Sequence, residues 1–191
     1  MVFALGAAGT GKSYIAAKYA IQQFLLGRYK RIVITRPTVE AGETLGLLPG
    51  GIEEKMHPWL LPIYDIFMED DGISKNEIKS MIGDGRIEIA PLQLLRGRTL
   101  KDCVIICDEM QNAESNQLKM LLTRIGEDSK MIITGDMSQN DRRKKSESGL
   151  EEFMYKLSVY GDVAGIQVIK FTDADCVRHP IIKTILDIYG E

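Results

Sequence analysis

A glycine-rich segment near the start of the chain has the spacing of a phosphate-binding loop. Residues 6–13 match the pattern G-x-x-x-x-G-K-[ST]. Glycines let the backbone curl so that several N–H groups converge on phosphate oxygens, and a following helix adds its positive dipole end. We expect Lys12 to reach the β- and γ-phosphates of a nucleotide and the Ser13 hydroxyl to bind Mg²⁺. The predicted nucleotide-binding residues are Gly6, Ala7, Ala8, Gly9, Thr10, Gly11, Lys12 and Ser13.

Two adjacent acids follow an apolar segment later in the chain. Residues 103–107 are typical of a strand buried on both faces, and Asp108 and Glu109 come directly after it. The carboxyl end of such a strand is where open α/β sheets bind ligands. Asp108 is predicted to hold Mg²⁺ through water, and Glu109 to polarise an attacking water. The alternative for Glu109 is a helix cap or a solvated side chain.

A third polar group follows another apolar strand pattern, residues 130–134. Gly135 and Asp136 come next, and Gln139 stands three residues further on. We expect Gln139 to touch the γ-phosphate and respond to its hydrolysis, with Asp136 supporting it. The alternative is a simple turn at the strand exit, which a Gly-Asp pair favours.

Strand and helix patterns alternate along the chain. Apolar runs predict strands at residues 2–5, 31–35, 86–90, 103–107, 130–134 and 166–171. Apolar stripes at helical spacing predict helices at residues 13–26, around 118–125, around 150–157 and after Pro180. Buried strands that alternate with helices indicate an α/β fold with a mainly parallel sheet and helices on both faces.

Residues 38–85 depart from this alternation. We interpret them as an insertion of loop and helices after the second strand, within a single domain that spans residues 1–191. Trp59, Tyr64 and Phe67 in this segment could stack on bases. Their helical spacing among aliphatic residues is more typical of a core or a subunit interface.

The composition limits the class of protein. The chain has 191 residues, of which 45% are hydrophobic and 27% charged, and a net charge of −3. These values are typical of a globular domain, and they argue against a polycationic nucleic-acid binder without excluding a local basic groove. Every apolar run is far shorter than the ~20 residues of a membrane span, and the start lacks a secretory signal pattern. We therefore expect a cytoplasmic protein with no membrane segment, whose three cysteines are reduced thiols.

The order of these motifs resembles the first motor domain of superfamily 1 helicases and, more narrowly, the PhoH family of ATPases. The matching stretches cover nearly the whole chain: residues 6–13, 35–43, 45–50, 87–91, 96–99, 108–112, 122–124, 135–139 and 177–180. The resemblance implies a RecA-like P-loop NTPase that binds ATP, hydrolyses it with Mg²⁺ and assembles as a homo-oligomeric ring, such as a hexamer. It also implies a role in unwinding or remodelling RNA.

Arginine residues are the candidates for completing such a site between subunits. We expect no second motor domain within these 191 residues, so neighbouring copies would have to close the cleft. A cation near the developing charge accelerates phosphoryl transfer and is often delivered by another subunit. The candidates are Arg98, Arg124 and Arg178, with Arg36 less favoured. Each could instead form a surface ion pair that contributes little.

Other arginines are candidates for contacts with RNA or single-stranded DNA. The resemblance places Thr35-Arg36-Pro37 where related motors grip a strand, and Arg96 and Arg98 offer planar donors for phosphates. The basic run Arg142–Lys145 could follow a nucleic-acid backbone electrostatically. The alternative for that run is a solvated loop.

The leading hypothesis is an ATPase coupled to RNA. A nucleotide-gated binding module with slow hydrolysis and no motor activity is the alternative. A small-molecule kinase is a third possibility, but Asp108, Glu109 and Gln139 form a pattern that disfavours it. The sequence contains no Asn-Lys-x-Asp motif for guanine, which argues against a GTPase.

Overall fold

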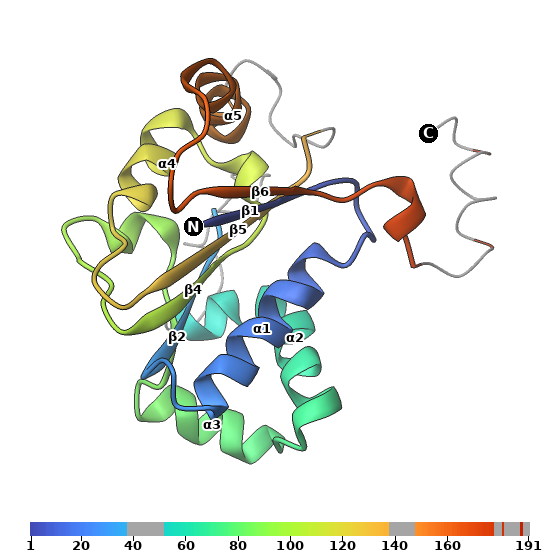
Figure 1. Ribbon diagram of the computed structural model, residues 1–191. Helices are drawn as coiled ribbons and strands as arrows, with labels where there is room; N and C mark the ends of the chain where they lie inside the picture. Colours follow the sequence, from blue (N-terminus) through green and yellow to red (C-terminus); the bar gives the residue numbers. More distant parts are fainter. Residues whose placement is uncertain (38–51, 138–147, 178–180, 182–187, 189–191) are drawn as a thin grey trace.

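Among the described residues, six strands form one sheet in which every neighbouring pair is parallel (Figure 1). The computed structural model describes residues 1–37, 52–137, 148–177, 181 and 188. The strand order is β3-β2-β4-β5-β1-β6. The bounds are β1 Val2–Leu5, β2 Arg31–Thr35, β3 Ile87–Ile89, β4 Cys103–Cys107, β5 Lys130–Gly135 and β6 Gln167–Lys170.

Helices cover both faces of this sheet (Figure 1). One face carries α1 (Lys12–Leu25), α2 (Ile52–Asp71) and α3 (Lys75–Gly83). The other carries α4 (Ser115–Leu122), α5 (Gly149–Tyr160) and two short 3-10 helices, η1 (Leu92–Leu95) and η2 (Met110–Asn112). A further 3-10 helix, η4 (Asp173–Asp175), follows β6.

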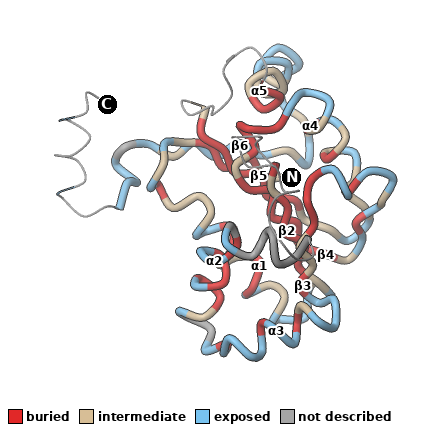
Figure 2. Tube along the Cα trace, turned by 180° about the vertical axis from the view of Figure 1, so that it is seen from behind, coloured by how far each residue is buried: buried red, intermediate tan, exposed pale blue. Residues whose placement is uncertain are grey.

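Two hydrophobic clusters, one on each face, follow from the alternation of side chains along the strands. Ile32 and Ile34 of β2 pack in the cluster with α1 and α2, whereas Val33 packs in the cluster with α4 and α5. Because β2 and β4 have helices on both faces, residues 32–34 of β2 and 103–107 of β4 are continuously apolar rather than alternating. Figure 2 shows the buried residues concentrated in these central strands.

The predicted fold class is confirmed: this is an α/β fold consistent with a P-loop NTPase, and the sheet is entirely parallel. The strands begin and end within one residue of the predicted bounds. Helices α2 and α3 lie between β2 and β3, where we expected inserted helices, while the extent of the insertion and the single-domain division stay predictions. Residues 38–51 and most of the predicted helix after Pro180 lie outside the described residues.

Two further expectations concern packing and membranes. Tyr64 and Phe67 of α2 are buried in the core, as their helical spacing indicated, rather than available to stack on bases. A search of the described helices finds no candidate for a membrane span.

Candidate functional site

The glycine-rich segment, residues 6–13, connects the end of β1 to the start of α1. A Cβ on Gly6 would lie 2.8 Å from both the Cβ and the carbonyl oxygen of Phe171, which is too close for a side chain. Gly11 precedes the first residue of α1 with φ of 80°, a left-handed conformation that favours glycine. The local geometry therefore explains why these two motif positions are glycines.

The start of α1 supplies positive potential to this loop. Among the described residues no side chain caps the helix, and its first turn contains no acid. A helix start of this kind attracts anions through its N–H groups and its dipole. Lys12 Nζ and Thr10 Oγ1 both donate to the Ala7 carbonyl oxygen, at 2.7 and 2.8 Å. The ammonium thus lies inside the curve of the loop, where the motif predicts phosphate.

Asp108 contacts two elements through hydroxyl groups and a third through its backbone. Its Oδ1 accepts hydrogen bonds from Ser13 Oγ of α1 and Thr134 Oγ1 of β5, both at 2.6 Å. Its N–H donates to the Thr35 carbonyl oxygen of β2 at 2.9 Å, and the residue is only 6% exposed. The two predicted metal ligands, Ser13 and Asp108, therefore meet although they are 95 residues apart in sequence.

These oxygen donors suit a hard divalent cation. Mg²⁺ is commonly held by one or two carboxylates together with phosphates and waters. Arg36 Nη1 lies 3.9 Å from Asp108 Oδ2, beyond hydrogen-bond distance, so the carboxylate takes its side-chain hydrogen bonds from neutral hydroxyls. The described residues hold no group of three or more His, Cys, Asp or Glu side chains that could bind a metal. A magnesium ion beside Asp108 and Ser13 would complete its coordination with phosphate and water oxygens.

Glu109 follows Asp108 in an uncommon backbone conformation. Its φ of 54° and ψ of 41° lie in the left-handed region, which costs a non-glycine residue about 1–2 kcal/mol. Its Oε2 accepts a hydrogen bond from Gln111 Nε2 at 2.5 Å. Its side chain makes no cap bond to η2, and the N-cap of α4 is Glu114. Glu109 is thus the N-cap residue of η2 through its backbone but not through its side chain, and its carboxylate is held at the carboxyl end of β4 by Gln111.

Gln139, predicted to contact the γ-phosphate, lies outside the described residues, as does the basic run 142–145. Asp136, which we expected to support Gln139, is buried just after β5. Its N–H donates to Gln111 Oε1 at 3.1 Å. The Gln111 side chain therefore contacts both Glu109 and the exit of β5.

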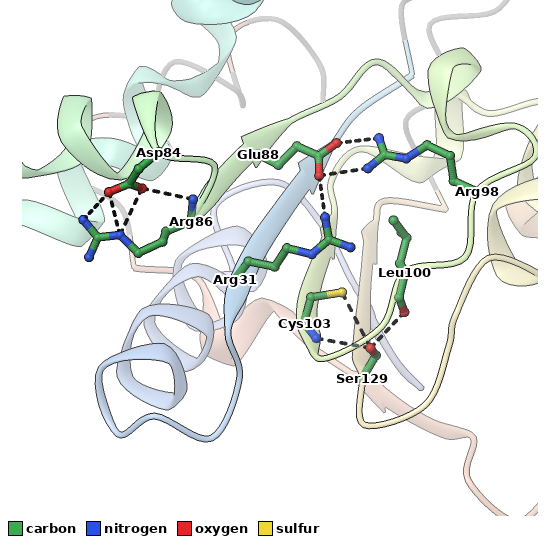
Figure 3. Close-up of polar contacts among 8 residues, drawn as sticks. All are labelled: Arg31, Asp84, Arg86, Glu88, Arg98, Leu100, Cys103 and Ser129. Atoms are coloured by element: carbon green, nitrogen blue, oxygen red, sulfur yellow. Dashed lines mark hydrogen bonds and ion pairs between the residues drawn. The ribbon is translucent and has the colours of Figure 1, made fainter.

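Arg98, a candidate for action on a neighbouring subunit, is engaged within its own chain (Figure 3). Its guanidinium forms two hydrogen bonds to Glu88 of β3, at 2.5 and 3.0 Å, and Arg31 contacts the same carboxylate at 2.9 Å. Hydrogen bonding by Arg98, aided by the charges of both arginines, lowers the pKa of Glu88, and the Glu88 carboxylate raises the pKa of Arg98. The ion-pair alternative thus describes these contacts, and a role on another subunit stays a prediction.

The remaining candidate arginines are placed differently. Arg124 Nη1 donates to the Arg98 carbonyl oxygen at 3.3 Å, which ties the end of α4 to the segment before β4. Arg178 lies outside the described residues. Arg96 is exposed and lines a surface hollow of about 540 Å³ together with Gln93, Asn116, Gln117 and Met120. Contacts of these arginines with nucleotide or nucleic acid stay predictions.

Comparison with known proteins gives the family. The family model described as "PhoH-like protein" matches residues 1–190. The chain belongs to the PhoH family. It is 46% identical over 191 residues to a PhoH-like protein of Bacillus subtilis and 43% identical over 189 residues to a PhoH-like protein of Synechocystis. It is also 36% identical over 190 residues to Protein PhoH of Escherichia coli K12.

These alignments cover 99–100% of the PhoH-family chain but only 53–58% of the three relatives. The chain therefore spans a little over half the length of the curated relatives it matches. The family assignment confirms the resemblance to the PhoH family that the motifs indicated.

Two residues of this PhoH-family site had no role assigned from sequence. Thr134 contacts Asp108 because β5 lies between β1 and β4, and local patterns do not specify strand order. Gln111 contacts Glu109 across η2; in the sequence it stood within the stretch 108–112 that resembles the PhoH family, without a role of its own. The structure brings together Ser13, Asp108 and Thr134, with Glu109 and Gln111 beside them, and places Arg98 in a separate cluster.

Proposed function

We propose that this chain binds ATP together with Mg²⁺ and hydrolyses the nucleotide. The observation that carries the proposal is the 2.6 Å contact between Ser13 Oγ and Asp108 Oδ1. It joins the phosphate loop to the acid pair of β4, two motifs that the sequence predicts separately. Both lie at the carboxyl ends of parallel strands, where this class of sheet binds its ligands.

The phosphate loop and the acid pair each have a chemical role in this proposal. The N–H groups of residues 6–13 and the Lys12 ammonium bind the phosphates. Mg²⁺ held by Ser13 and Asp108 would neutralise phosphate charge. Glu109 accepts a proton from a water molecule as the water oxygen bonds to the γ-phosphorus. The bond between the γ-phosphorus and the bridging oxygen breaks, ADP and inorganic phosphate leave, and the proton passes from Glu109 to solvent.

The proposal assigns transition-state charge stabilisation to Gln139 and to an arginine of a neighbouring copy in a homo-oligomeric ring. Arg178, Arg124 and Arg98 are the candidates for that arginine. The electrostatic gain from such a cation is large because it acts where charge develops on the phosphoryl oxygens. To act on a neighbouring copy, Arg98 would have to leave its ion pair with Glu88 or contact the nucleotide while that ion pair is kept.

We further propose that the ATPase is coupled to RNA or single-stranded DNA. The hollow beside Arg96 supports this, because its lining residues come from the segments that follow β3 and β4 in the sequence, and all of them except Met120 carry an amide or a guanidinium group. Such groups can hydrogen-bond phosphates, sugars and bases. Arg36, Arg98 and the run Arg142–Lys145 complete the proposed set of contacts.

Phosphate release by the purified chain tests this function. We expect Mg²⁺-dependent turnover that single-stranded RNA stimulates, and loss of turnover in Lys12→Ala. Normal turnover in Lys12→Ala would contradict the phosphate-loop assignment. ATP binding with negligible turnover and no RNA stimulation would favour the nucleotide-gated module. Solution mass measured with and without ATP tests the ring, and a monomer under both conditions would rule out an arginine in trans.

A further inference from the structure

Gln111 is a buried glutamine whose side chain contacts the candidate active site. It is 2% exposed and lies on η2, immediately after the acid pair. Its Nε2 donates to Glu109 Oε2 at 2.5 Å, and its Oε1 accepts from the Asp136 N–H at 3.1 Å. Its main-chain oxygen accepts from Ser148 Oγ at 3.1 Å. One residue thus contacts Glu109 and the residues on both sides of the stretch 138–147.

The orientation of the Gln111 amide is fixed by the chemistry of its two neighbours. Only the NH₂ end can donate to a carboxylate, and only the oxygen can accept from the Asp136 N–H. A reversed amide would place its oxygen against the Glu109 carboxylate and its NH₂ group against the Asp136 N–H. The space is also closed: a Cβ on Gly135 would come within 3.3 Å of Gln111 Oε1 and 2.3 Å of a Leu150 methyl group.

We propose that Gln111 is a positioning residue for the Glu109 carboxylate. The inference rests on the proposed ATP hydrolysis, in which Glu109 accepts the proton of the attacking water. By engaging Oε2, the amide holds the carboxylate in one orientation and leaves Oε1 as the atom that receives the proton. Its links to Asp136 and Ser148 connect that orientation to the exit of β5 and to the start of α5.

Two substitutions separate this role from general support of the fold. Gln111→Ala removes both side-chain contacts, whereas Gln111→Glu keeps an acceptor for Asp136 and replaces the donor with a second carboxylate. In single-turnover hydrolysis we expect both variants to be slower on the order of 10–100-fold, the cost of a misoriented catalytic group. Affinity for a fluorescent, non-hydrolysable ATP analogue should be unchanged. Gln167→Ala, an exposed glutamine of β6, serves as the matched control with the wild-type rate.

A double-mutant cycle decides whether Gln111 acts through Glu109. In a Glu109→Gln background, Gln111→Ala should cause no further loss of rate, because the group it positions is already gone. The inference would be overturned if Gln111→Ala lowered the rate in that background by the same factor as in the wild type. A wild-type rate in Gln111→Glu, or a fall in affinity that matches the fall in rate, would overturn it as well. A wild-type chain without turnover would overturn the proposed ATPase and this inference together, whereas an active wild type with a silent Gln111→Ala overturns only the latter.

Discussion

Two carboxylates of the same sheet, at strands separated by β2, have different partners. Glu88 of β3 is bound by two guanidinium groups, from Arg98 and Arg31, at 2.5–3.0 Å. Asp108, after β4, takes its side-chain hydrogen bonds from two neutral hydroxyls, and Arg36 stands 3.9 Å away. The charge of Glu88 is compensated within the chain, so it ties β3 to its neighbours. The charge of Asp108 is compensated within the described residues only by the longer ion pair to Arg36, so this carboxylate is less fully paired than Glu88 and can also take a metal cation.

The largest effect on turnover is expected from replacing Glu109, the acid next to Asp108. Glu109→Gln keeps the hydrogen-bonding shape of the side chain but removes the base, so turnover should fall by about 10²–10⁴-fold. Binding of a fluorescent ATP analogue should persist, because the phosphate loop is intact. Phosphate release measured beside analogue titration checks both. Wild-type turnover in this variant would show that Glu109 is not the base.

Asp108→Asn sharpens the comparison directly. Without the carboxylate charge, Mg²⁺ should no longer tighten binding of the ATP analogue, and turnover should fall by on the order of 10²-fold. Analogue titrations with Mg²⁺ and with EDTA measure the difference. Glu88→Gln is the matched control and should keep the Mg²⁺ effect. Equal loss of that effect in both variants would break the distinction between the two carboxylates.

Glu88→Gln should instead affect stability. Its loss weakens two ion pairs at partly exposed groups, so the free energy of unfolding should drop by about 1 kcal/mol at neutral pH. Urea unfolding followed by circular dichroism measures it. Asp84→Asn, in the exposed Asp84–Arg86 pair of Figure 3, should cost less. A larger loss in Asp84→Asn would contradict the structural importance given to Glu88.

The smallest expected effect is the pH dependence of the stability difference between the wild type and Glu88→Gln. The pKa of Glu88 is lowered in the folded chain, chiefly by the Arg98 hydrogen bond. Its contribution is therefore fully present above the unfolded-state pKa of about 4.3 and is lost as the pH falls through the lower folded-state value. The stability gap between wild type and Glu88→Gln should be constant near neutral pH and shrink below about pH 4. A gap that persists undiminished in acid would exclude the ion pair as its cause.

The sequence predicted the parts of this molecule that depend on local pattern. The loop 6–13 and the acids 108 and 109 could be recognised from their residue types and spacing. The buried strands could be recognised from their apolar runs. The partners of these residues depend on strand order. Thr134 meets Asp108 only because β5 lies between β1 and β4.

The arginines show the same limit. Arg31 meets Glu88 because β2 and β3 pair with Val33 opposite Glu88, and Arg98 reaches the same carboxylate from the segment between η1 and β4. Nothing in the spacing of these residues indicates that register. The sequence therefore could not show whether a given arginine forms an ion pair within its own chain or contacts another molecule.

A crystal structure with Mn²⁺ and a non-hydrolysable ATP analogue tests the central claim most directly, because manganese can be located by its anomalous scattering. The account predicts the β- and γ-phosphates within the loop 6–13 and the metal between Ser13 Oγ and the Asp108 carboxylate. A nucleotide bound elsewhere, or a metal peak away from both of these side chains, would contradict it.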